Sequence, residues 1–202
     1  MDISALIRPF VNRPELARVL DEVADDVRLK SLYELGPRDM AKLFDAAIDN
    51  EPLTLDHFVP ADTPTGEEVV HDGKNSLAFF RRFQKRFYRP GGAPVLWGYN
   101  DQPLWQLTGP GYFVAYGQEP KEVVFDYGRV PEGPVPEDWP SLLPNKKGLA
   151  HFVYEDLKDV VRRVSNLVSV GRVYRRGRPR DLWFMLVRDT GRPTFTLPYP
   201  RP

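Results

Sequence analysis

The stretch "GPGYFVAYGQEPKEVVFDYG", residues 109–128, contains two segments of alternating side chains separated by a short turn. In the first segment Tyr112, Val114 and Tyr116 share one side of an extended chain, and the residues between them share the other side. Only residues 117–120, which include glycine and proline, separate the two segments. We therefore expect the two segments to pair as an antiparallel hairpin.

The same kind of pattern recurs before and after this hairpin. Short segments rich in aromatic and β-branched residues alternate with turn residues, which is typical of strands joined by tight turns. The additional expected strands span residues 68–71, 95–100, 103–109, 167–175, 181–189 and, as an edge strand, 194–199. Strands joined in this way predict a mainly antiparallel sheet.

Other stretches have apolar residues at the spacing of a helix. We expect four helices, at residues 13–30, 36–50, 75–89 and 148–165. The last of these has an apolar stripe that would pack on the sheet, with Leu157 in the stripe and Lys158 outside it. Prolines at the first turn support the first two helices.

These elements predict the α+β class. N-terminal helices precede a curved, mainly antiparallel sheet that carries one long helix, and closure of the sheet into a small lipocalin-like barrel is an alternative. The lipocalin comparison concerns the fold alone, because "LWGYN", residues 96–100, places tryptophan before glycine, unlike the Gly-x-Trp signature. We expect a helical segment at 1–52 to pack on a body at 53–202 as one folding unit.

Composition excludes several kinds of chemistry. The 202-residue chain has no cysteine, so it contains no disulfide, no thiolate metal site and no cysteine nucleophile. Its formal net charge is zero, yet residues 1–70 hold 15 acidic and 7 basic side chains, whereas residues 71–202 hold 13 and 21. We interpret this as an acidic front segment that docks on a basic remainder. The alternative is a basic face for an anionic partner.

The first residues show no basic segment followed by an apolar run, and no stretch approaches the roughly 18 apolar residues of a membrane span. We therefore expect a cytoplasmic protein without a membrane partner.

The aromatic content suggests a binding pocket. Twelve Phe, nine Tyr and four Trp supply more aromatic area than a sheet-and-helix core requires, and Tyr and Trp each carry a polar end. Our leading hypothesis is a partly apolar pocket for a small apolar or aromatic ligand, with no cofactor. Its expected lining consists of Trp97, Trp105, Tyr112, Tyr116, Tyr127 and Trp183.

A second hypothesis is an enzyme that uses the same pocket. Asp126, at the end of an expected strand, and His57 are the candidate general bases. Asp126 is solvated if the aromatic face of its strand is the core, and is buried with a shifted pKa if the opposite face is. A metal site would need His57, His71 and an aspartate to meet, and because nothing in their spacing requires this, we expect no metal.

A third hypothesis is an interaction module. Arg175, Arg176 and Arg178 cluster at the tip of the expected C-terminal hairpin and could contact a polyanion. A nucleic-acid partner is disfavoured, because no strand motif of an RNA-binding domain accompanies the arginines. The sequence leaves the oligomeric state open. A closed core without a pocket would favour this third hypothesis.

Overall fold

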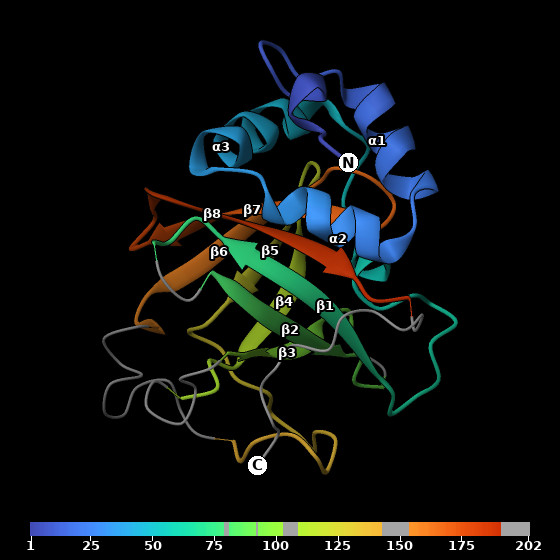
Figure 1. Cartoon of the computed structure of the whole chain (residues 1–202). Helices are drawn as coiled ribbons and strands as arrows, with labels where there is room; N and C mark the ends of the chain where they lie inside the picture. Colours follow the sequence, from blue (N-terminus) through green and yellow to red (C-terminus); the bar gives the residue numbers. More distant parts are fainter. Residues whose placement is uncertain (79–80, 92, 103–108, 143–153, 191–202) are drawn as a thin grey trace.

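A computed structural model describes the chain except for residues 79–80, 92, 103–108, 143–153 and 191–202. Within the described chain, eight antiparallel strands follow one another in sequence order and close into a barrel, and helices lie on one side of it (Figure 1). The strands are β1 (Glu68–Asn75), β2 (Arg82–Tyr88), β3 (Leu96–Asp101), β4 (Phe113–Gln118), β5 (Glu122–Asp126), β6 (Leu157–Arg163), β7 (Val168–Arg175) and β8 (Arg178–Arg188).

The expected hairpin at residues 111–128 is confirmed. Strands β4 and β5 pair antiparallel, with Val114 opposite Asp126 and Gln118 opposite Glu122. The C-terminal hairpin of β7 and β8 is confirmed as well. Pairing of β1 with β8 closes the barrel, so the lipocalin-like alternative describes the sheet better than an open curved sheet. The edge strand expected at 194–199 and most of the strand expected at 103–109 lie outside the described residues.

Two expected helices are wrong. The region predicted as a helix at 75–89 contains the end of β1 and all of β2, and the region at 148–165 contains β6. Phe83 and Phe87 are four residues apart, which places them on one face of a helix but also on one face of a strand. Leu157 and Val161 have the same ambiguous spacing. The described part of the second region therefore contains no long helix on the sheet, and its residues 148–153 lie outside the described residues.

The helices that pack on the barrel in the described part of the chain come from its first 57 residues. They are α1 (Arg13–Glu22), α2 (Asp25–Tyr33) and α3 (Pro37–Ala46), with short 3₁₀ turns η1 (Ser4–Leu6), η2 (Ala47–Asp49) and η3 (Leu55–His57). The helix expected at 13–30 is interrupted where Val23 and Ala24 are extended, with ψ of 155° and 149°. Among the described residues, no helix has the length and apolar character needed to cross a membrane.

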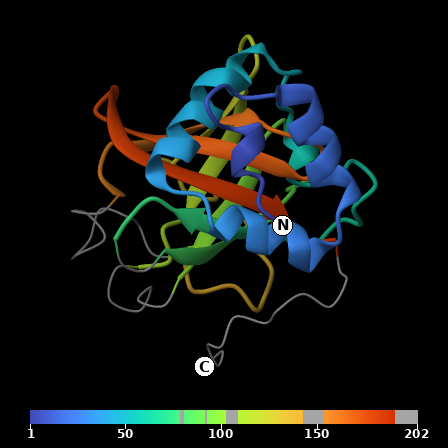
Figure 2. The ribbon, with the colours of Figure 1, turned by 45° about the horizontal axis from the view of Figure 1, so that its top comes forward.

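The helical layer shares a core with the outside of the barrel. Figure 2 shows the helices lying across β7 and β8. The outward-facing residues Val168 and Val170 of β7, and Met185 and Val187 of β8, are buried against apolar side chains of the helices. Because alternate residues of a strand face opposite sides, β7 and β8 contribute to this core and to the barrel interior at once.

Each of the three α-helices has a cation at its C-terminal end. The Arg28 guanidinium donates to carbonyl groups at the end of α1. Lys74 of β1 donates to the Leu35 carbonyl just after α2 at 2.6 Å, and Arg162 of β6 donates to the Phe44 carbonyl of α3 at 2.8 Å. Carbonyl groups at a helix C-terminus carry partial negative charge, so these contacts are favourable. Two of them also tie a helix to a strand.

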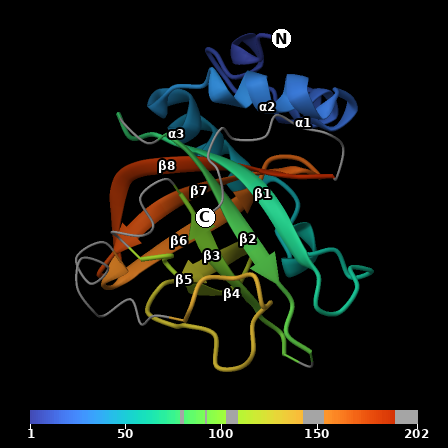
Figure 3. The same cartoon turned by 60° about the horizontal axis from the view of Figure 1, so that its bottom comes forward.

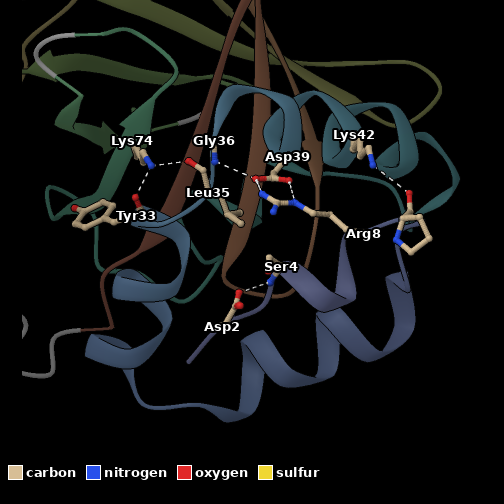
Figure 4. Close-up of polar contacts among 10 residues, drawn as sticks. Asp2, Ser4, Arg8, Tyr33, Leu35, Gly36, Asp39, Lys42 and Lys74 are labelled. Atoms are coloured by element: carbon tan, nitrogen blue, oxygen red, sulfur yellow. Dashed lines mark hydrogen bonds and ion pairs between the residues drawn. The ribbon is translucent and has the colours of Figure 1, made fainter.

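Figure 4 shows how the start of the chain is held against this layer. Arg8 donates two hydrogen bonds to the carboxylate of Asp39, at 2.7 and 2.5 Å. The same carboxylate accepts the backbone N–H of Gly36 at the start of α3. Asp39 thus caps the positive end of α3 and binds the N-terminal segment, and its pKa is lowered chiefly by its hydrogen bond from Arg8.

Candidate functional site

One end of the barrel is closed by the segment at residues 53–59, which includes η3. The ring of Phe58 stacks on Phe87 with 5.0 Å between ring centroids, and meets Phe125 edge to face at 5.1 Å. His71 donates from Nε2 to the Phe58 carbonyl at 3.0 Å. We call this the plugged end.

The opposite end, which we call the loop end, is where the connections at residues 76–81, 102–112, 127–156 and 176–177 leave the strands. The part of the third connection that follows β5 appears in yellow to orange at the front of Figure 3. Its residue Trp139 packs against Tyr99 and Tyr112 on the outside of the barrel. The two longest connections, residues 102–112 and 127–156, are both at this end, whereas those at the plugged end span only residues 89–95, 119–121 and 164–167.

Four polar side chains, from β2, β3, the end of β5 and β6, meet inside the barrel. Lys85 of β2 donates from Nζ to Asn100 Oδ1 of β3 at 2.6 Å and to the hydroxyl of Tyr127, directly after β5, at 2.5 Å. Its Nζ also lies 3.4 Å from Oδ2 of Asp159 in β6. The Tyr127 hydroxyl donates to the same carboxylate oxygen at 2.9 Å. We call these four residues the polar network.

Aromatic rings enclose the Lys85 ammonium. Its Nζ is 5.0 to 5.6 Å from five ring centroids, namely those of Phe83, Phe113, Phe125, Tyr127 and Phe184. A cation near several ring faces is stabilised by the negative charge on those faces. The rings therefore offset part of the cost of removing the lysine from water.

Burial sets the protonation chemistry of the network. Lys85 and Asp159 are only 2% and 3% exposed. Desolvation lowers the pKa of Lys85 although Asp159 attracts its charge, and desolvation raises the pKa of Asp159 despite the nearby lysine. Burial also raises the pKa of Tyr127 well above its ordinary value. Both members of the ion pair are thus shifted towards their neutral forms, which eases proton transfer between them.

Glycines in the strands make room for the interior rings. A Cβ atom on Gly73 would lie 2.5 Å from Cζ of Phe83, and one on Gly98 would lie 2.6 Å from Cε2 of Phe113. Gly171 faces the ring of Phe184 with the same close approach. The interior around the polar network is consequently filled by aromatic side chains.

Tyr154 covers the network residue Tyr127. The two rings are stacked, with centroids 5.3 Å apart and planes 17° apart. Gln102 donates to the Tyr154 hydroxyl at 3.1 Å, and Tyr154 packs closely over Gly111, whose φ is +60°. Tyr154 belongs to the connection that precedes β6, so this ring lies outside the strands and at the loop end.

Of the six residues expected to line a ligand pocket, the five that the structure describes do not come together. Tyr127 points into the barrel, and Trp105 lies outside the described residues. The remaining four do not face the barrel interior, because they alternate along their strands with interior residues or pack in clusters outside the barrel. They are Trp97, Tyr112, Tyr116 and Trp183. Tyr112 is fully buried under the β5–β6 connection, where its hydroxyl donates to the Pro140 carbonyl at 2.5 Å.

The two candidate general bases lie apart from the polar network. Asp126 is on the outer face of β5, where its carboxylate accepts from Lys158 Nζ at 2.8 Å and from the backbone N–H of Gly128 at 2.9 Å. His57 lies in the plugged end, and burial lowers its pKa well below the ordinary value. The described residues contain no group of three or more His, Asp or Glu side chains arranged to hold a metal.

One of the three arginines at the tip of the β7–β8 hairpin forms ion pairs with neighbouring carboxylates. Arg176 lies 3.4 Å from carboxylates of both Glu155 and Asp156. Arg178 is exposed, and Arg175 is partly buried. These three residues are close together at the end of β7 and the start of β8, as expected from the hairpin.

The cavities recorded among the described residues are on the surface. The larger, about 360 Å³, lies where α1 meets α2 and is lined by residues 21–25, Arg28, Leu167 and Thr190. The other is a narrow crevice beside α3. Neither lies inside the barrel, and an interior filled in this way is what the interaction-module hypothesis expects.

Sequence reasoning missed Lys85, Asn100 and Asp159. Lys85 stands between Phe83 and Phe87 in steps of two, and Asp159 stands likewise between two apolar residues. In a strand this spacing places the charge on the interior face, but a charge at such a position ordinarily indicates a solvated face, so the pattern by itself did not identify the network.

Fold and site together define the class as a closed eight-stranded antiparallel barrel with an N-terminal helical layer and a charged network in its interior. No family model, no curated protein and no solved structure matches the chain.

Proposed function

We propose that the protein binds a small, partly apolar molecule inside the loop end of the barrel, against Tyr127 and the polar network. The observation that supports this most is the buried pair of Lys85 and Asp159 within an aromatic interior. Packing alone does not require such a pair, because apolar residues of similar volume usually stabilise a core at least as well. Binding sites, in contrast, combine apolar walls with a few fixed polar groups.

The loop end is the proposed entrance, because Phe58 fills the plugged end. Since side chains fill the interior, a ligand must displace one of them. Tyr154 is the suitable side chain, because it lies outside the strands and stacks flat on Tyr127. A planar apolar group that took the place of this ring would keep the stacking contact and reach the polar network.

A pair of fluorescent probes of matched shape tests this proposal. We expect 2-naphthol to bind about tenfold more tightly than 2-methylnaphthalene, because its hydroxyl can hydrogen-bond to the network, and tenfold corresponds to about 1.4 kcal/mol. Binding of the apolar probe should hardly change between low and high salt, because apolar contacts are not screened.

Variants at interior and at outward-facing positions of the barrel strands supply the control. The double change Lys85→Met with Asp159→Leu should abolish the preference for 2-naphthol. The double change Lys158→Met with Asp126→Leu removes an ion pair of the same residue types from the outer face and should preserve the preference. Absence of saturable binding, or equal effects of the two double changes, would overturn the proposal.

A second candidate function rests on the β7–β8 hairpin. Its distal part, residues 172–182, contains five arginines and one aspartate. An anionic partner would bind such a surface with an affinity that falls steeply as salt rises. Heparin chromatography tests this on the native chain and on a variant with Arg175, Arg176 and Arg178 all changed to glutamine. If both proteins are retained weakly and to the same extent, the hairpin is not a polyanion site.

A further inference from the structure

We propose that Lys85 forms a reversible imine with an aldehyde ligand inside the barrel, a proposal that rests on the ligand-binding function above and names its ligand class. Lys85 is a primary amine enclosed by aromatic rings, with a carboxyl group and a phenol hydroxyl beside it. This combination supplies the nucleophile, the proton donor and the exclusion of water that imine formation requires.

The position of the amine is fixed by its neighbours. Asn100 and the Tyr127 hydroxyl hold Nζ at 2.6 and 2.5 Å, whereas the contact with Asp159 is longer, at 3.4 Å. The Tyr127 hydroxyl joins the two charged groups, because it accepts from Lys85 and donates to Asp159. A proton can therefore pass from the ammonium to the carboxylate directly or through the hydroxyl.

Another lysine of the same chain serves as an internal comparison. Lys158 directly precedes Asp159 in β6 but faces outward, with 49% of its side chain exposed. Its hydrogen bond to Asp126 raises the pKa of its amine, whereas burial lowers that of Lys85. At neutral pH a larger fraction of Lys85 is therefore the nucleophilic free amine.

The reaction balances without an oxidant or a reductant. The Lys85 ammonium first gives a proton to Asp159. The lone pair on Nζ then forms a bond to the carbonyl carbon, the π electrons of the carbonyl move to oxygen, and a proton from nitrogen converts the adduct to a carbinolamine. Asp159 returns its proton to the hydroxyl group, the C–O bond breaks and water leaves. The product is an iminium ion beside the restored Asp159 carboxylate.

The surroundings select the kind of aldehyde. The rings nearest Nζ are those of four phenylalanines and Tyr127, so the ligand that fits is apolar and planar, with its carbonyl group at one end. An aromatic or conjugated aldehyde has these properties. The network then acts as an anchor that holds such a compound covalently and releases it on hydrolysis.

Reductive trapping tests the proposal. The full chain is incubated at neutral pH with 2-naphthaldehyde and sodium cyanoborohydride, and peptide mapping by mass spectrometry locates the modified lysines. We expect Lys85 to be modified at least about tenfold faster than Lys158, in line with the reactivity of desolvated lysines. Lys85→Met should remove this fast modification, and Lys158→Met should retain it.

The change Asp159→Asn separates the chemistry from the binding. It should slow modification of Lys85 about tenfold, as expected for loss of a proton-transfer group, while 2-methylnaphthalene still binds. Modification of exposed lysines alone, together with normal binding of 2-methylnaphthalene, would overturn the imine proposal and leave ligand binding intact. If 2-methylnaphthalene does not bind and 2-naphthaldehyde does not modify Lys85, both proposals are overturned.

Discussion

At the scale of single residues, Lys85 and Asp159 stand out because each is a buried charge that depends on the other. We expect Lys85→Met alone to lower the free energy of unfolding by about 3–5 kcal/mol, because it leaves a buried carboxylate without its counter-ion. Adding Asp159→Leu should restore most of that loss. Urea denaturation of the two single variants and the double variant measures the coupling, and strictly additive losses would contradict an ion pair.

His71 makes the stability of the fold depend on pH. It is completely buried, and desolvation lowers its pKa to about 3, against about 6.5 for an unfolded histidine. Between those values the unfolded chain binds a proton that the folded chain does not. The contribution of His71 is therefore fully present above about pH 6.5 and declines as the pH falls towards about 3, by up to about 1.4 kcal/mol per pH unit.

The conservative change His71→Gln tests this linkage, because glutamine retains an N–H donor for the Phe58 carbonyl. Unfolding free energies measured across this pH range should fall less steeply for the variant than for the native chain. Two parallel pH profiles would show that His71 does not contribute.

At the scale of secondary-structure elements, cations at helix ends connect the two layers. We expect Lys74→Met to lower the free energy of unfolding by about 1–2 kcal/mol, because it removes charged hydrogen bonds to carbonyl groups at the end of α2. In this variant, amide hydrogen exchange should accelerate more in α2 than in α1. Lys30→Met, at an exposed position in the last turn of α2, is the comparison and should have a smaller effect than Lys74→Met, because an exposed cation near a helix end contributes less than a part-buried one.

Glycines in the strands allow a second test at this scale. Gly171→Ala should lower the free energy of unfolding by about 1–3 kcal/mol, because its methyl group would overlap the ring of Phe184. Adding Phe184→Leu should recover part of the loss, which thermal unfolding can measure. No recovery would mean that the glycine is needed for another reason.

The element scale also explains which parts of the fold could be read from the sequence. The hairpins of β4–β5 and β7–β8 were predictable, because turn residues bound them and their apolar residues alternate. Strands β2 and β6 were not, since a spacing of four suits a helix and a strand equally. Lys85 and Asp159 increased the ambiguity, because a charge in the middle of a segment ordinarily indicates a solvated face.

The polar network could not be predicted from the sequence, for a related reason. Lys85 and Asn100 are partners on the adjacent strands β2 and β3, but Asp159 lies four strands further along, and only the closed barrel brings it next to Lys85. Of the residues expected to bind a ligand that lie in the described part of the chain, Tyr127 alone joins this network. The others alternate with the interior positions, and a shift of one residue exchanges the two faces of a strand.

At the scale of the whole molecule, we expect residues 1–52 and the barrel to unfold together. The helices share a core with the outer faces of β7 and β8, and Phe58 links the following segment to the barrel interior. Phe58→Ala should lower the free energy of unfolding by about 3–5 kcal/mol. Circular dichroism of the helices and tryptophan fluorescence should report the same midpoint, and two separate transitions would contradict a single folding unit.

The closure of β1 against β8 has a consequence for how the chain must be made. The strand that completes the barrel is the last one described, and the helices that rest on it come first in the chain. During synthesis the helical segment therefore emerges before β7 and β8, the strands on which it packs. More than a hundred further residues must be added before its apolar side chains can be buried. Contacts so distant in sequence make folding slow. A chain that stopped after β6 would have neither a closed barrel nor the two strands, β7 and β8, whose outer faces supply most of the apolar contacts with its helices.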